Sequence, residues 1–187
     1  MTLLNHIEIN TLTTEGIELL YRIFESDFIL NRTFLTNGTH TFQIDVKERS
    51  LCPCPFGNTE KPEKFWHVVT RDKKNSQKSN NPCPDPREKL RAYDKARAKR
   101  IHWIKILIDQ WQNDPEIVHF YQTRSSREDN LLIWHKKEKF LVIIRRIGRA
   151  HSRYLVSSYV LHDSEEHRYE KQLQEYLKNA PTGAEWF

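Results

Sequence analysis

Four hydrophobic runs follow one another closely between Ile117 and His162, and they constrain the fold of this chain more than any other feature. Polar stretches rich in turn-forming residues separate the runs at positions 125–130, 136–139 and 148–153. Strands joined by such short links must pair antiparallel, because a parallel return needs a crossover of about a dozen residues or more. We therefore predict a four-stranded antiparallel meander formed by IVHFYQ, NLLIWHK, KFLVIIRRIG and RYLVSSYVLH.

The first 71 residues carry weaker signals of secondary structure. Residues 2–10 and 41–46 alternate between apolar and polar side chains, which favours strands. From Thr13 onward apolar residues recur every three or four positions as far as Phe28, which predicts an amphipathic helix. The run FWHVVTR, residues 65–71, is aromatic and β-branched, and this composition predicts another strand.

A long helix is predicted from about Arg87 to Trp111, because Asp85-Pro86 is a typical helix start. Its first half is basic, and its second half carries an apolar stripe that ends at Trp111. A closing helix is predicted over residues 168–178. Together these elements predict an α+β fold: an antiparallel sheet of four to five strands, with the long basic helix packed on one face and helical elements at both ends of the chain.

The chain has 187 residues, which suffices for one domain with a real core and is marginal for two. We expect residues 1–60 to form an acidic N-terminal extension with one helix and one strand, and residues 61–187 to form the main domain. Residues 72–86, DKKNSQKSNNPCPDP, are almost entirely polar or proline. We expect them to be a mobile insertion within the main domain.

Charge is distributed unevenly along the chain. Residues 61–100 hold 13 Lys/Arg against 5 Asp/Glu, and residues 121–155 hold 9 against 3. The first 60 residues hold 4 against 8. A basic middle between acidic ends predicts one positive face, which would concentrate polyanions such as RNA. The alternative is a solvated surface of mixed charge.

The three cysteines do not make a disulfide framework, because their number is odd. Cys52, Cys54 and Cys83 with a nearby histidine are a candidate zinc site, but paired zinc ligands usually have two to four residues between them and here there is one. We expect no metal and no cofactor. The chain has neither a secretory signal nor an apolar run of about 18 residues, so we expect a cytoplasmic protein that does not enter membranes.

Side chains suited to RNA chemistry occur on two of the predicted strands. Alternation places His67 and Arg71 on one face of their strand, and it places Ser157 and Tyr159 together with Leu155 on one face of the last strand. Cleavage of RNA by its own 2′-hydroxyl needs a base, an acid and cations near the phosphate. Histidine serves either proton role, and the arginine fork matches two phosphate oxygens.

Each of these residues also has an ordinary structural explanation. A strand histidine is more often structural, and a serine such as Ser157 can simply be a small residue beneath a helix. Tyr159 can be a core aromatic with a wet hydroxyl. Arg97 and Arg100 can belong to a solvated helix face.

The sequence resembles the barnase–EndoU–colicin–RelE (BECR) nuclease superfamily, in its phage and mobile-element branches, over roughly residues 64–165. The resemblance rests on FWHVVTR, RIHWIKIL, LLIWHKKEKFLVIIRR and RYLVSSYVLH in that order. It implies a helix followed by a four-stranded antiparallel sheet and a metal-independent ribonuclease that acts as a toxin. It places Ser157 where the family usually has a catalytic Thr or Ser, and His67 at the strand histidine of some branches. Ser158, where alanine is more usual, and the insertion depart from the pattern.

We therefore hypothesise a metal-independent endoribonuclease that cleaves RNA (tRNA or mRNA) by 2′-hydroxyl transphosphorylation, with an antitoxin or immunity protein as a further partner. Two alternatives stay open: a non-catalytic nucleic-acid-binding module, and a protein-interaction component of a toxin or phage-defence system. The expected catalytic residues are His67, Ser157, Tyr159 and Arg100. The expected substrate-binding residues are Arg71, Arg91, Arg97, Arg127 and Arg145.

Overall fold

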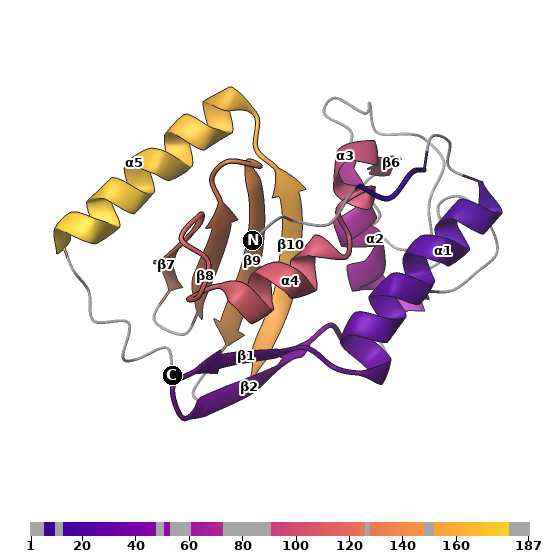
Figure 1. Cartoon of the computed structure of the whole chain (residues 1–187), viewed down its shortest axis with the longest axis horizontal. Coiled ribbons are helices and arrows are strands. Elements are labelled where there is room, and N and C mark those ends of the chain that lie inside the picture. The colour runs from indigo at the N-terminus through magenta and orange to yellow at the C-terminus, as the bar shows by residue number, and fades with distance from the viewer. Residues whose placement is uncertain are drawn as a thin grey trace.

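The computed structural model of the chain describes residues 6–9, 13–47, 51–52, 61–72, 91–125, 128–147 and 152–179. Its centre is a six-stranded sheet in the order β1-β2-β10-β9-β8-β7. Helices cover both faces of this sheet, and α4 and α5 lie on opposite sides of it (Figure 1). The prediction of an α+β fold with helical elements near both ends is confirmed.

The predicted four-stranded meander is confirmed. Its strands are β7 (Ile117–Ser125), β8 (Glu128–His135), β9 (Phe140–Ile147) and β10 (Arg153–Val160). Consecutive strands pair antiparallel throughout, as their short links require.

The sheet also contains a hairpin from the N-terminal part of the chain, so it is larger and more mixed than predicted. β1 (Phe34–Asn37) and β2 (His40–Asp45) pair antiparallel across a turn in which Gly38 adopts a positive φ of 57°. β2 then runs parallel to β10, in register at Arg153 and Tyr154. The expectation of a purely antiparallel sheet of four to five strands is wrong, because a hairpin far away in the sequence joins the free side of β10.

One face of the sheet carries the larger hydrophobic core. The helices α1 (Thr14–Glu25), α2 (Glu63–Val69) and α4 (Trp103–Gln110) bury their apolar sides there, and α1 continues into a short π-helix (Ser26–Leu30). The fully buried residues of this core include Leu20, Phe24, Phe65, Leu107 and Ile144. Each such side chain contributes roughly 1.5–3 kcal/mol of hydrophobic free energy. Because α1 and β2 share this core with the meander, the N-terminal part packs as an integral piece of the described structure.

The other face of the sheet carries a smaller core under α5 (Asp163–Asn179). Tyr169 and Leu173 of α5 are buried against Phe120, Leu141 and other apolar residues of the meander. The helix begins five residues before the predicted start at 168, because Asp163, Glu165 and Glu166 are favourable acids for a first helical turn.

Residues 65–69 are helical, so the prediction of a strand over 65–71 is wrong for most of its length. Phe65, Trp66, Val68 and Val69 are all buried by α2, and tertiary burial outweighs their β propensity. The helix ends at Thr70, whose backbone is extended and whose hydroxyl donates to the carbonyl of Trp66 at 2.5 Å. Only then does the chain extend, as β5 (Thr70–Asp72).

The predicted single helix over 87–111 is also wrong, within the described residues 91–111. β6 (Arg91–Tyr93) pairs with β5, and two separate helices follow it, α3 (Lys95–Ala98) and α4. Asp94 caps α3 by accepting the backbone N–H of Arg97 at 3.2 Å, which fixes a new helix start inside the predicted one. The apolar stripe itself is confirmed, because Ile101, Ile104, Leu107, Ile108 and Trp111 are all buried.

Two further expectations fall wholly or partly outside the described residues, and one short pairing was not predicted. Residues 6–9 of the first predicted strand are not in a strand, and the rest of 2–10 lies outside the described residues. Another two-residue pairing joins β3 (Leu51–Cys52) to β4 (Lys61–Pro62). Residues 73–86 of the expected mobile insertion lie outside the described residues.

Candidate functional site

The side of β10 that β2 joins is where α2 and α3 approach the sheet. The described pairing with β2 covers Arg153 and Tyr154 only. Farther along the same strand, the ammonium of Lys64 in α2 lies 3.4 Å from the carbonyl oxygen of Val156. Figure 1 shows α2 and α3 next to β10. We call the place where α2, α3 and β10 meet the junction, and define it by Lys64, His67, Arg97, Ser157 and Tyr159.

Arg97 of α3 connects the three elements of the junction. Its Nη1 donates to the carbonyl oxygens of His67 at 3.1 Å and Thr70 at 3.0 Å, and it lies 3.5 Å from Oγ of Ser157. Its Nε lies 3.3 Å from a carboxylate oxygen of Asp94. Since the Arg97 and Asp94 side chains are each only 15% exposed, this network is largely shielded from water. Arg97 therefore holds the end of α2 against β10.

Tyr159 lies between Arg97 of α3 and Tyr169 of α5. The guanidinium carbon of Arg97 lies 5.0 Å from the centre of the Tyr159 ring, and the Tyr159 hydroxyl hydrogen-bonds the hydroxyl of Tyr169 in α5. Burial, followed by this hydrogen bond, raises the pKa of Tyr159 well above its usual value. A tyrosine in this setting keeps its proton and positions Arg97 through a cation–π contact.

Ser157 and Tyr159 share one side of β10, as predicted, but Leu155 does not share it with them. An irregularity in the pairing of β10 with β9 falls between Leu155 and Ser157. Leu155 is opposite Ile144, which belongs to the larger core, whereas Ser157 is opposite Ile143, which belongs to the smaller one. The extra residue, Val156, shifts the alternation by one position.

His67 stands at the outer side of the junction on the exposed face of α2. Its Nε2 lies 3.3 Å from a carboxylate oxygen of Glu63, one helical turn earlier, and its side chain is 33% exposed. The prediction that His67 and Arg71 share one face of a strand is wrong, because His67 belongs to the helix α2. In a helix His67 instead shares a side with Lys64 and Glu63, at spacings of three and four residues.

Glu63, Lys64 and Asp94 were missed as site residues by the sequence reasoning. The Glu63–His67 spacing of four residues and the preceding Pro62 are compatible with a helix that carries a carboxylate–imidazole pair, but they do not decide between helix and strand. The aromatic and β-branched composition of this segment favoured a strand instead.

Arg100 and Arg145 are held by other contacts. Arg100 donates to the carbonyl of Ala96 at 3.0 Å and lies 4.9 Å from the centre of the Trp103 ring. Burial lowers the pKa of Arg100. Arg145 donates from Nε to the side-chain oxygen of Asn130 at 3.0 Å, at the middle of the sheet.

The three remaining predicted substrate-binding residues are placed only in part. Arg71 lies on β5 with an exposed side chain. Arg91 belongs to β6, where the backbone alone is described, and Arg127 lies outside the described residues. Their roles stay predictions.

Within the part of the chain that the structure describes, no three histidine, cysteine, aspartate or glutamate side chains gather as metal ligands. Cys54 and Cys83 lie outside that part, and of Cys52 only the backbone is described. None of the described helices is both long enough and apolar enough to cross a membrane.

Comparisons with known proteins give no relative: no family model, no curated protein and no solved structure matches this chain significantly.

Proposed function

We propose that the chain binds RNA at the junction and cleaves it as a metal-independent endoribonuclease. The observation that carries this proposal is the position of Arg97, which contacts the carbonyl of His67 and approaches the hydroxyl of Ser157. Arg97 thereby connects α2, which carries Lys64 and His67, with Ser157 of β10. An imidazole, a hydroxyl and a cation are the kinds of group that RNA cleavage by the 2′-hydroxyl uses.

In the proposed reaction, His67 accepts the proton of the 2′-hydroxyl as the 2′-oxygen attacks phosphorus. The bond from phosphorus to the 5′-oxygen then breaks, and His67 returns its proton to that leaving oxygen. The products are a 2′,3′-cyclic phosphate and a 5′-hydroxyl. The carboxylate of Glu63 stabilises the imidazolium between the two transfers, because an adjacent opposite charge favours the protonated form.

The cations and hydroxyls have separate tasks in this proposal. Lys64 neutralises charge on the phosphate, and Ser157 orients a phosphate oxygen by hydrogen bonding. Arg97 and Tyr159 position these groups, since the Arg97 guanidinium already serves two carbonyls and the raised pKa of Tyr159 makes it a poor proton donor. Arg100, which was expected to be catalytic, has no role in the proposed reaction. The toxin context and an antitoxin partner rest on the resemblance to the BECR superfamily alone.

Incubation of the pure protein with tRNA and mRNA in EDTA tests the proposal. We expect cleavage with 2′,3′-cyclic phosphate ends by the wild type and a loss of about 100-fold or more in His67→Ala. His40→Ala is the matched control, because His40 is an exposed histidine in the β1–β2 hairpin. Intact RNA at high protein concentration, or full activity in His67→Ala, contradicts the proposed reaction.

A second candidate function is RNA binding without cleavage. It is favoured by the internal contacts of Arg97, which give this residue a structural task independent of catalysis. Under it, Lys64→Ala weakens RNA binding while His67→Ala and Ser157→Ala leave both binding and RNA integrity unchanged. Measurement of affinity alongside cleavage separates the two candidates.

A further inference from the structure

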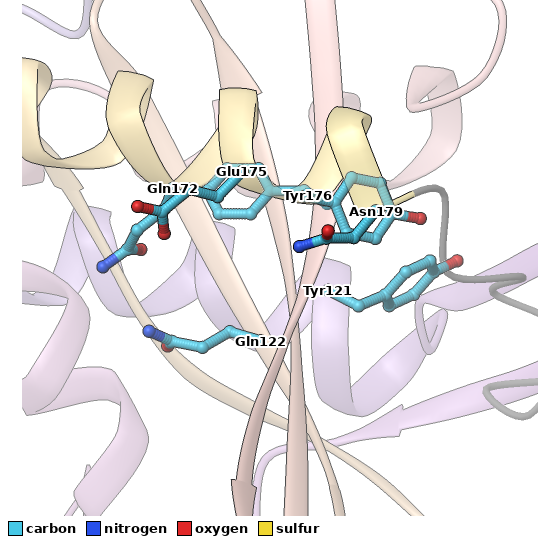
Figure 2. A pocket seen from close by; sticks show the side chains of 7 residues that line it. Tyr121, Gln122, Gln172, Glu175, Tyr176 and Asn179 are labelled. Atoms are coloured by element: carbon cyan, nitrogen blue, oxygen red, sulfur yellow. The ribbon is translucent and has the colours of Figure 1, made fainter.

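A pocket of about 380 Å³ opens between α5 and β7, an edge strand of the six-stranded sheet. Figure 2 shows Gln172, Glu175, Tyr176 and Asn179 extending from α5 above Tyr121 and Gln122 of β7. This volume is at the lower end of the range for small-ligand sites, so it suits a small ligand.

The chemistry of this pocket fits a nucleobase better than a phosphate. Its walls hold two tyrosine rings, whose centres are 5.8 Å apart, together with three amide side chains and one carboxylate. No lysine or arginine lines the described pocket, so nothing there would neutralise a phosphate. Amides donate and accept at once, as the edges of bases do, and tyrosine rings provide stacking surfaces for bases.

One wall group of the pocket lacks a hydrogen bond. The side-chain oxygen of Gln172 is buried and makes no hydrogen bond to any other described residue. A buried acceptor without a donor costs about 1–3 kcal/mol. An exocyclic amino group of a base would satisfy it, and the Glu175 carboxylate offers a second acceptor in the same pocket.

A row of polar side chains connects this pocket with β10. The strand register places Tyr154, Arg145, Asn130 and Gln122 next to one another across β10, β9, β8 and β7. Gln122 is itself part of the pocket, and Ser157 of the junction is opposite Ile143, two residues before Arg145. The row spans three strand spacings, roughly 14 Å, which a few nucleotides of extended single-stranded RNA cover.

We propose that the pocket between α5 and β7 is a subsite for a nucleobase with an exocyclic amino group, above all adenine. The base belongs to single-stranded RNA whose backbone crosses the sheet at Arg145 and reaches the junction. Asparagine and glutamine side chains match adenine because they can donate and accept at its edge simultaneously. This inference rests on the proposed function, since it takes RNA as the ligand, and it adds which base is recognised and where.

Fluorescence anisotropy with a non-cleavable 2′-O-methyl octa-adenylate tests the inference. A second set of oligonucleotides carries one abasic residue, moved along the strand position by position. For the wild type we expect one position at which loss of the base weakens binding about tenfold, the effect typical of one stacked base. The remaining positions should matter less.

The variants connect that position to the pocket. Gln172→Ala and Tyr176→Leu should bind the intact and the abasic oligonucleotide nearly equally. Gln174→Ala is the matched control, because Gln174 is an exposed glutamine of the same helix outside the pocket. Gln172→Ala keeps the inference testable if Tyr176→Leu loosens the packing of Tyr176 against Phe120.

The outcomes separate this inference from the proposed function. If no abasic position matters, or if the loss of affinity at the abasic position survives in both pocket variants, the nucleobase subsite is wrong while RNA binding stands. Lys64→Ala should weaken the binding of all oligonucleotides alike and leave the effect of the abasic position unchanged. If the wild type binds no RNA, the proposed function fails and the subsite fails with it.

Discussion

Nη1 of Arg97 lies 3.5 Å from Oγ of Ser157, although 60 positions of sequence separate the two residues. The same nitrogen donates to two backbone carbonyls at the C-terminal end of α2. One guanidinium therefore joins α2, α3 and β10, and its removal should affect both folding and the junction.

We predict that Arg97→Ala lowers the free energy of unfolding by about 1–3 kcal/mol, because it removes the donor of two largely buried carbonyls. Arg97→Lys should recover only part of this loss, since an ammonium cannot reproduce the arginine fork. Urea unfolding measures the effect. Arg71→Ala, at an exposed arginine of β5, is the control and should change stability by less than about 0.5 kcal/mol.

The hydroxyl pair of Tyr159 and Tyr169 should behave as a coupled unit. We expect Tyr159→Phe and Tyr169→Phe each to cost about 1 kcal/mol, and the double variant to cost little more than either single one, because the second change removes a hydroxyl that has already lost its partner. A double-mutant cycle on unfolding free energies tests this. Additive costs would show that the two hydroxyls do not interact.

Lys61 makes a second internal contact whose loss should be costly. Its ammonium lies 2.7 Å from a carboxylate oxygen of Glu18 and 4.1 Å from the centre of the Tyr21 ring, and its side chain is 5% exposed. We predict that Glu18→Gln destabilises the fold by roughly 1–3 kcal/mol, since it leaves a buried cation without its carboxylate. Lys61→Met should cost less, because no charge then remains buried. Thermal melts of both variants check the order, and a greater loss in Lys61→Met would contradict it.

Asp27 should make stability fall as pH rises through the weakly acidic range. Burial raises the pKa of Asp27 from 3.8 to about 6, although Lys105 opposes the shift. The folded state therefore holds its proton more tightly than the unfolded state. The resulting stabilisation is complete below about pH 4 and is lost as pH rises through about 6.

The Asp27→Asn variant isolates this effect. Its free energy of unfolding relative to the wild type should be about 1 kcal/mol higher at pH 7 than at pH 4, a figure reduced for partial solvent screening. Urea unfolding of both proteins across that range measures the difference. A constant difference would show that Asp27 titrates alike in both states.

The sequence predicted the meander because its information is local. Four runs with short polar links leave antiparallel pairing as the only geometry. Ser157 and Tyr159 share one side of β10 because they are two residues apart in a strand that pairs regularly with β9 at these positions. The helix over 87–111 and the strand over 65–71 were wrong for the opposite reason. Their propensities compete closely, and burial against distant elements decided between them.

By itself, then, the sequence determined the meander, the apolar stripe of α4 and the shared side of Ser157 and Tyr159, since each depends on residues close in the chain. Only the tertiary structure decided that residues 63–69 are helical, that a distant hairpin lengthens the sheet, and that Arg97 joins His67 to Ser157. Those arrangements depend on which surfaces meet after the chain folds back, and no local pattern encodes the partner of a side chain 60 residues away.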